Sequence, residues 1–280
     1  MSLKDILAII VSPTGDEPAL KAADALAARF GAQMAVAHVT ALPDEPLAYE
    51  PSVVAGVWAE LLGRARAEAA AERAALTGRL DPSGQPIEVR PAEALARDVG
   101  RVAAVHARYA DLAVLTRPFE GDERGLRQEL VEGVLYHSGR PALIVPPHWA
   151  GAEIGRRPIL AWDASREATR ALSEADMFID GAEHVTVVTV DAKPKAFGHG
   201  EQPGANIAAH LARRGASVAV ENIESERGGT TQALLAACKA ARGDLMIMGA
   251  YGAPRLLEMV FGGATRDLLA SADIPLLMAH

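Results

Sequence analysis

The chain has 280 residues, half of them hydrophobic, so it is long enough for one large domain or two of ordinary size. Only 4% of the residues are aromatic and the net charge is −8. These values argue against the aromatic stacking platforms and concentrated basic faces by which proteins bind nucleic acid. We therefore expect no nucleic-acid partner.

The apolar stretch Ile6 to Val11 is too short to span a membrane, and the charged Lys4 and Asp5 before it are untypical of a signal peptide. We interpret it as a buried strand and expect no membrane partner. The single cysteine, Cys238, has no partner for a disulfide or a zinc site. It lies in the helical pattern ALLAACKAA, which favours a packed thiol over a reactive one. A cytoplasmic location fits these features.

In chain order, the first half alternates apolar strands with helical patterns. Strands are predicted at KDILAIIV, QMAVAHV, IEVRP, DLAVL and PALIVP, and an Ala-rich helix at PALKAADALAARFG. The second half follows the same order. Its strands are RPILAWDA, HVTVVTV, SVAVENI, DLMIM and PLLMAH, and its helices include REATRALSEADMFI, ANIAAHLARRG and TRDLLASA.

The chain is thus an internal repeat. Asp111 and Asp244 precede matching strands, and Pro141 and Pro275 begin the last strand of each half at nearly the same interval. Apolar strands alternating with helices predict a parallel sheet covered on both faces. We predict an α/β protein of two tandem doubly wound domains, residues 1–149 and 150–280, joined near 146–158.

Glycines gather after the fourth strand of the second half. Gly249 begins at the carboxyl end of DLMIM, and Gly262 and Gly263 directly precede the helical pattern TRDLLASA. Ligands of doubly wound sheets sit beyond the carboxyl ends of the strands, and a helix start offers N–H groups to a phosphate. Thr265 would add a hydroxyl donor. The span is no Walker loop, and the alternative is that these glycines only turn the chain.

The spacing G-x2-G-x9-G, matched by Gly249, Gly252 and Gly262, resembles the nucleotide signature of the universal stress protein family. The family's other mark is an aspartate that ends the first strand and contacts the adenosine of ATP. The segment ILAWD supplies it as Asp163. One departure is Gly263, which stands where the family usually has Ser or Thr. It keeps the backbone N–H but loses a hydroxyl.

The resemblance spans essentially the whole chain and implies a Rossmann-like fold of the adenine nucleotide alpha hydrolase-like type. The implied strand order in each half is 3-2-1-4-5, with ATP, bound with or without Mg²⁺, between strands 1 and 4. Thr189 and Met248 would border the adenine. Ala264 would lie among the backbone groups of the phosphate loop, and Thr265 matches a Ser frequent in the family.

Trp162 directly precedes Asp163 and is a candidate to stack on the base. Neighbouring side chains of a strand point to opposite faces, however. The alternation favours an indole directed away from the side of Asp163.

The first half lacks the signature. When the halves are aligned on Asp111 and Asp244, Gly249, Gly252, Gly262 and Gly263 are replaced by Thr116, Phe119, Glu129 and Leu130. Ile10 stands in the place of Asp163. Acidic residues nearby would disfavour a phosphate. We expect this half to be a degenerate partner that packs and regulates. The alternative is a site for a different ligand.

Other catalytic or metal sites are weakly indicated. His199, Glu201, Asp191 and His210 are metal candidates without tight ligand spacing, so we expect no metal site, and GHGEQPG is interpreted as a loop before ANIAAHLARRG. The chain contains neither G-x-S-x-G nor H-E-x-x-H, and no residue stands out as a base for ATP hydrolysis. We expect no catalytic residues and no enzyme beyond a very slow ATPase.

The leading hypothesis is an ATP-binding protein with a sensing or regulatory role in the stress response. The alternatives are a slow ATPase, an enzyme acting on another small molecule, and a scaffold that binds no nucleotide. Each half ends in an apolar strand, PALIVP or PLLMAH, whose exposed edge would invite pairing. We therefore expect an intramolecular pseudo-dimer, which leaves room for a further homodimer; the alternative is two separate domains on a flexible linker.

Overall fold

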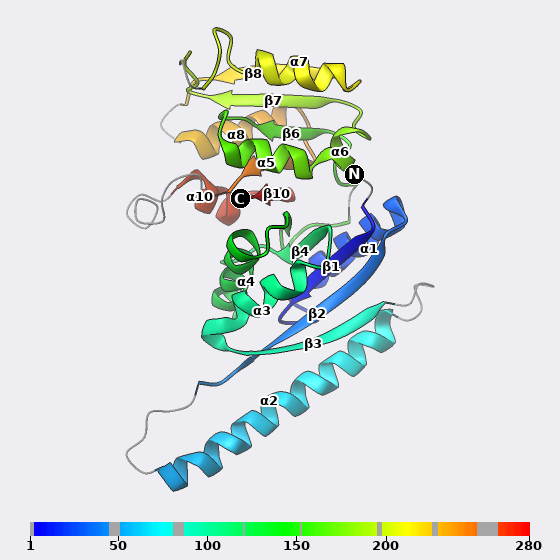
Figure 1. Cartoon of the computed structure of the whole chain (residues 1–280), viewed down its shortest axis with the longest axis vertical. Coiled ribbons are helices and arrows are strands. Elements are labelled where there is room, and N and C mark those ends of the chain that lie inside the picture. The colour runs from blue at the N-terminus through cyan, green and yellow to red at the C-terminus, as the bar shows by residue number, and fades with distance from the viewer. Residues whose placement is uncertain are drawn as a thin grey trace. The chain divides into compact units, whose positions relative to one another are not determined.

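The computed structural model shows an α/β chain of two compact units, Lys4–Arg140 and Pro141–His280, the latter joined by the residues before Lys4 (Figure 1). The structure describes residues 3–44, 51–80, 87–119, 121–151, 153–194, 198–225, 229–250 and 263–280. Among them, no helix has the length and apolarity that a membrane span needs.

The N-terminal unit alternates strand and helix, as predicted. Its elements are β1 (Asp5–Ile10), α1 (Glu17–Phe30), β2 (Gln33–Leu42), α2 (Pro51–Leu80), β3 (Glu88–Leu95), the 3-10 turn η2 (Ala96–Asp98), α3 (Val99–Ala107), β4 (Leu112–Thr116) and α4 (Arg124–His137). Its strands lie in the order β3-β2-β1-β4. β1 and β4 are buried along almost their whole length, as strands of a parallel sheet with both faces covered must be.

The second unit repeats the pattern. It contains β5 (Ala142–Val145), β6 (Pro158–Ala161), α5 (Arg166–Glu174), α6 (Asp176–Ile179), β7 (Val185–Val190), α7 (Ala205–Arg213), β8 (Val218–Ile223), α8 (Gly229–Ala240), β9 (Leu245–Gly249), α10 (Ala264–Ser271) and β10 (Leu276–Ala279). The order β8-β7-β6-β9-β10 is the predicted 3-2-1-4-5. The predicted helix after β6 is divided at Ala175 into α5 and α6.

The two repeat-marking aspartates perform the same task. Oδ2 of Asp111 accepts the N–H groups of Lys4 at 2.8 Å and Asp5 at 3.1 Å, where β1 begins. The carboxylate of Asp244 accepts the N–H groups of residues 155–157, just before β6, at 2.8–3.1 Å. Each aspartate satisfies the backbone donors at the start of the first strand from the loop that leads into the fourth.

β5 completes the sheet of the second unit. It pairs with β10 in antiparallel fashion, with Ile144 opposite Leu276 and Leu143 opposite Leu277. All four residues of both strands are buried. The two apolar strands that close the sequence repeats therefore do pair with each other. The contact-based boundary lies at Arg140/Pro141, before β5, whereas the repeat pattern predicts it after this strand.

α3 and α4 pack backbone to backbone in the N-terminal unit. A Cβ built on Gly133 of α4 would overlap the backbone of Gly100 in α3, and a Cβ on Gly100 would overlap the carbonyl of Glu129. Backbone atoms cannot move aside as a flexible side chain can. This close approach requires glycine in both helices.

We predict that Gly133→Ala lowers the free energy of unfolding of the full chain by about 2 kcal/mol or more, because the added methyl group must push two helices apart. Gly125, on the exposed side of the same α4, has open space around it and is the matched control. Gly125→Ala should raise stability by up to about 1 kcal/mol, since alanine is the better helix former. Urea unfolding monitored by circular dichroism gives both values, and equal effects would contradict the close packing.

Candidate functional site

The strand order of the second unit reverses between β6 and β9. β6 pairs with β9 on one side, Leu160 opposite Ile247, and with β7 on the other, Ala161 opposite Val188. The connections from β6 and from β9 therefore leave the sheet in opposite directions, which opens a crevice beyond their carboxyl ends. The predicted switch point between the first and fourth strands is present here.

Asp163 lies at this edge and shapes the turn into α5. Its side chain is exposed, and Oδ1 accepts the N–H of Ser165 at 3.0 Å. Ser165 in turn caps α5, because its Oγ accepts the N–H of Ala168 at 3.0 Å. Between them, Ala164 takes a left-handed conformation with φ of 61°. Asp163 thus presents a carboxylate to the crevice while it holds the start of α5 in place.

Gly249, at the end of β9, is required by the packing of α5. A Cβ at this position would lie 2.6 Å from the backbone nitrogen of Ala168 and 2.6 Å from the carbonyl carbon of Glu167. The first turn of α5 therefore rests directly on Gly249. The space that a side chain would take here is filled by the protein itself, a reason for glycine that is independent of any ligand.

α10 begins at the same edge of the sheet. Gly263 is its N-cap and has an extended backbone, with φ of −71° and ψ of 154°. As a glycine it supplies no side-chain cap, and the positive end of the helix dipole lies at this edge. Ala264 is half-buried, whereas Thr265 is buried. Gly252 and Gly262 lie outside the described residues.

The two residues expected to border the adenine are buried. Thr189, on β7, is only 1% exposed, and its hydroxyl donates to Oδ1 of Asn222 in β8 at 2.5 Å. Met248, on β9, is also buried, opposite Met278 of β10. Of the predicted site residues that the structure describes, Asp163, Gly249, Gly263 and Ala264 retain some exposure.

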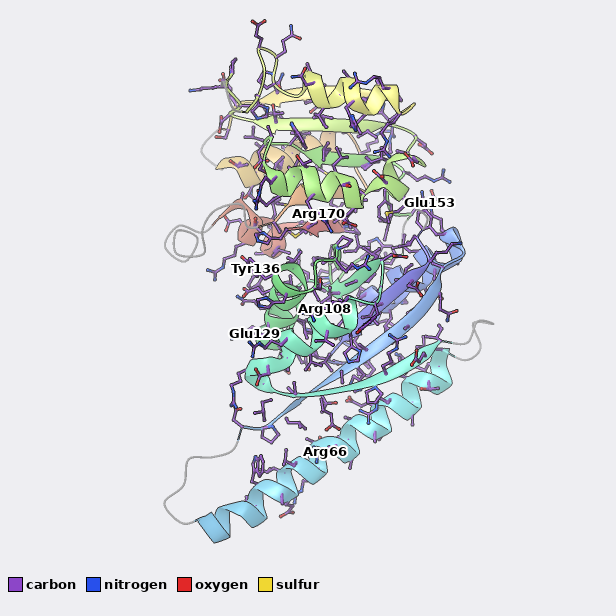
Figure 2. All side chains as sticks on the ribbon, in the orientation of Figure 1. Arg66, Arg108, Glu129, Tyr136, Glu153 and Arg170 are labelled. Carbon is purple, nitrogen blue, oxygen red and sulfur yellow. The ribbon has the colours of Figure 1, made fainter. Side chains whose placement is uncertain are left out.

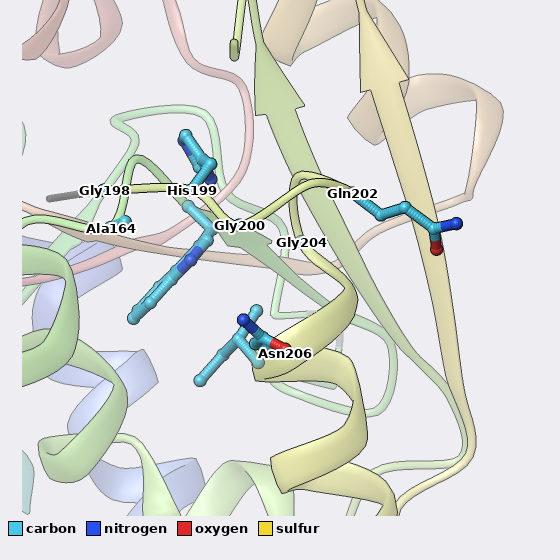
Figure 3. Close-up of a pocket in the computed structure, with 9 residues that line it drawn as sticks. Ala164, Gly198, His199, Gly200, Gln202, Gly204 and Asn206 are labelled. Atoms are coloured by element: carbon cyan, nitrogen blue, oxygen red, sulfur yellow. The ribbon is translucent and has the colours of Figure 1, made fainter. Parts of the chain in front are cut away.

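A pocket of about 200 Å³ opens beside Asp163, on the α7 side (Figure 3). Trp162 and Ala164 line it from the end of β6, whereas Asp163 between them does not. The alternation expected from the pleat is therefore confirmed. The other walls are the loop after β7 and the first turn of α7, with Gly198, His199, Gly200, Gln202, Gly204, Asn206 and Ile207. Sequence reasoning identified this segment as the loop before a helix but missed the pocket.

The residues considered as metal candidates, for which no metal site was expected, do not form a metal-binding group among the described residues. Across the described part of the chain, no three His, Cys, Asp or Glu side chains are grouped as metal ligands would be. Asp191 instead accepts the N–H of Ser225 at 2.8 Å and its hydroxyl at 2.5 Å, and these bonds lower the pKa of its carboxyl. Cys238 is buried as predicted, and its burial raises the pKa of the thiol to about 11. A thiol of this kind is unreactive near neutral pH.

The matching edge of the N-terminal unit is built differently. Ile10 is fully buried in the place of Asp163. Asp16 at the start of α1 is also buried, and it accepts the N–H groups of Val11 and Ser12 at 2.9 and 3.0 Å. Its other oxygen lies 2.7 Å from Nε of Arg127, a residue of α4.

This ion pair is buried at the edge where the N-terminal unit lacks the glycine signature. Both side chains are at least nine-tenths buried, and a Cβ on Gly15 would collide with the Arg127 guanidinium. Glu129, which replaces Gly262, is an exposed residue of α4 (Figure 2). The sequence showed that the signature is missing here, but not the buried pair that joins α1 and α4.

Comparison with protein-family models gives a match in the second half of the chain. Residues 156–280 match the model of the Universal stress protein family. This part of the chain, from just before β6 to the end of β10, is similar to that family. The match begins just before β6 and ends with β10, so it includes Asp163, Gly249, Gly263 and the other predicted site residues.

Solved structures extend the fold to the whole chain. A universal stress protein from Archaeoglobus fulgidus is 16% identical, with a TM-score of 0.69, over 98% of this chain and 95% of its own. A putative universal stress protein from Pseudomonas aeruginosa is 14% identical, with a TM-score of 0.59, over 99% and 93%. The cytoplasmic domain of a prokaryotic cation chloride cotransporter is 12% identical, with a TM-score of 0.50, over 99% and 96%. A sequence comparison with curated proteins gave no match.

The turn between Asp163 and Ser165 leads to a prediction about stability. The left-handed backbone of Ala164 costs about 1 kcal/mol for a residue with a Cβ and nothing for glycine. We expect Ala164→Gly to leave the fold unchanged and to raise the free energy of unfolding by roughly 0.5–1 kcal/mol. Ala209, exposed in the middle of α7, is the control, because glycine there should lower stability by about 1 kcal/mol. If thermal unfolding shows that both substitutions lower the free energy of unfolding, the backbone strain at Ala164 is contradicted.

Proposed function

We propose that this protein binds one ATP per chain in its C-terminal half and acts as a sensor or regulator in the stress response, within the cytoplasm. The observation that carries the proposal is the family match of residues 156–280 together with Asp163 at the reversal of strand order. Asp163 contacts the adenosine part in this proposal. The α10 start and the glycines before it hold the phosphates, with or without Mg²⁺.

The arrangement of charges supports an anionic ligand at this edge. Two helix starts, at Ser165 and at Gly263, direct their positive ends toward the carboxyl side of β6 and β9. Met248 and Gly249 end β9 at this same edge. The buried Thr265 and Thr189 limit the direct contacts, so backbone N–H groups carry the phosphate recognition in the proposal.

The N-terminal half is proposed as a regulatory partner without nucleotide. Its corresponding edge is closed by the buried pair Asp16–Arg127, and removal of either partner of such a pair costs about 3–5 kcal/mol. A phosphate would have to break this pair to enter. We propose that the two halves form an intramolecular pseudo-dimer, and the pairing of β5 with β10 supports it.

We predict that titration calorimetry with ATP gives one site per chain and that Asp163→Asn weakens binding about ten-fold or more. Asn keeps an oxygen for the Ser165 N–H, so the turn stays while the charge and its bond to the ligand are lost. Asp273, exposed at the opposite edge just before β10, is the matched control, and Asp273→Asn should bind like the parent. Two equivalent sites, or full affinity in Asp163→Asn, would refute the assignment. If ATP does not bind at all, the result would support the alternative of a scaffold that binds no nucleotide.

We further predict that bound ATP is hydrolysed negligibly or very slowly. The sequence offers no evident base that could activate water, and it lacks a Walker lysine. Phosphate release measured over hours should stay far below one turnover per second. Turnover of several per second that persists through repeated purification, and is lost in Asp163→Asn, would support the enzyme alternative instead.

A further inference from the structure

The pocket beside Trp162 has a chemistry of its own. We call it the ring pocket and define it by Trp162, Ala164, His199, Gly204, Asn206 and Ile207. Its volume of about 200 Å³ is smaller than the roughly 300–1,000 Å³ typical of pockets for drug-sized ligands. The space suits a single ring system rather than a whole nucleoside triphosphate.

The walls select the type of ring. Trp162 offers an indole surface, and Ala164 and Ile207 add apolar contacts, a combination that favours stacking of a planar group. No Lys or Arg is among the described residues that line it, so nothing in these walls matches a phosphate. His199 and Asn206 carry donors and acceptors that can read the polar edge of a heteroaromatic ring.

The loop beside the pocket packs closely on the sheet. Gly204 has φ of 80°, and a Cβ there would lie 2.8 Å from Cγ1 of Val220 and 3.5 Å from Cγ2 of Thr189. The loop therefore sits directly on the sheet at Gly204, and α7 begins at its edge without a side-chain cap. His199 and Asn206 stand on different sides of the pocket, whereas the amide of Gln202 points away from it (Figure 3).

We propose that the ring pocket binds a planar heteroaromatic ring of nucleobase size, stacked on Trp162 and recognised at its edge by Asn206 and His199. Two sources present such a ring: a free heterocycle, and the base of a nucleotide. In the second case the inference rests on the proposed function, and Trp162 with Asn206 determines which base is accepted. If the ring is a free heterocycle, the inference does not depend on the proposed function.

The test uses the fluorescence of Trp162. The chain has three tryptophans, so the full-length Trp58→Phe/Trp149→Phe variant reports Trp162 alone. Adenine and ATP are titrated separately. We expect saturable quenching of the Trp162 emission by adenine, by ATP, or by both. Quenching by adenine alone identifies a free heterocycle, and quenching by ATP that is lost in Asp163→Asn identifies the base of the bound nucleotide.

Variants then separate recognition from folding. Calorimetry should show the quenching ligand bound about ten-fold or more weakly by Trp162→Leu, because base–aromatic stacking is lost, and near the parent level by Trp162→Phe. Asn206→Ala should weaken binding several-fold, whereas Gln202→Ala should not. Thermal unfolding confirms that each variant is folded.

The outcomes distinguish the two proposals. If ATP binds by calorimetry and neither ligand changes the Trp162 emission, the ring pocket is refuted and the nucleotide function stands. If adenine quenches and ATP does not bind, the nucleotide function is refuted and the ring pocket stands. Unchanged affinity in a folded Trp162→Leu variant overturns the stacking.

Discussion

The contact between the first turn of α5 and Gly249 sets the geometry of the whole carboxyl edge. Because the helix backbone touches the end of β9, the chain must turn sharply after β6. Asp163, the left-handed Ala164 and the capping Ser165 accomplish that turn within three residues. The same turn directs Trp162 and Ala164 toward α7 and leaves Asp163 outside the ring pocket. One close approach thus divides this edge into a charged side and an aromatic side.

Most of the fold follows from local patterns in the sequence. Apolar runs bounded by turn residues identify strands such as β1 and β9, and the repeated Asp111 and Asp244 align the two halves. The direction of Trp162 follows from the two-residue period of a strand. The strand order and the place of Asp163 came from the family resemblance.

Other features depend on residues distant in sequence, which pattern alone does not pair. The need for glycine at 249 arises from residues 167–168, far earlier in the chain. The Asp16–Arg127 pair joins positions 111 residues apart, and the ring pocket combines the end of β6 with the start of α7. Thr189 and Thr265 were expected beside the ligand, but their burial depends on packing that no single segment shows. The assignment of the site residues as ligand contacts stays a prediction.

The pairing of β5 with β10 has a consequence for the order in which the protein is made. Ile144 and Leu276 face each other, yet every element from β6 to α10 lies between them along the chain. Domains tend to fold as they emerge from the ribosome, N-terminal first, at about 5–20 residues per second. While all of those elements are synthesised, the apolar strand β5 therefore lacks β10 as its partner on this edge. The second unit therefore cannot finish its sheet until β10 has emerged.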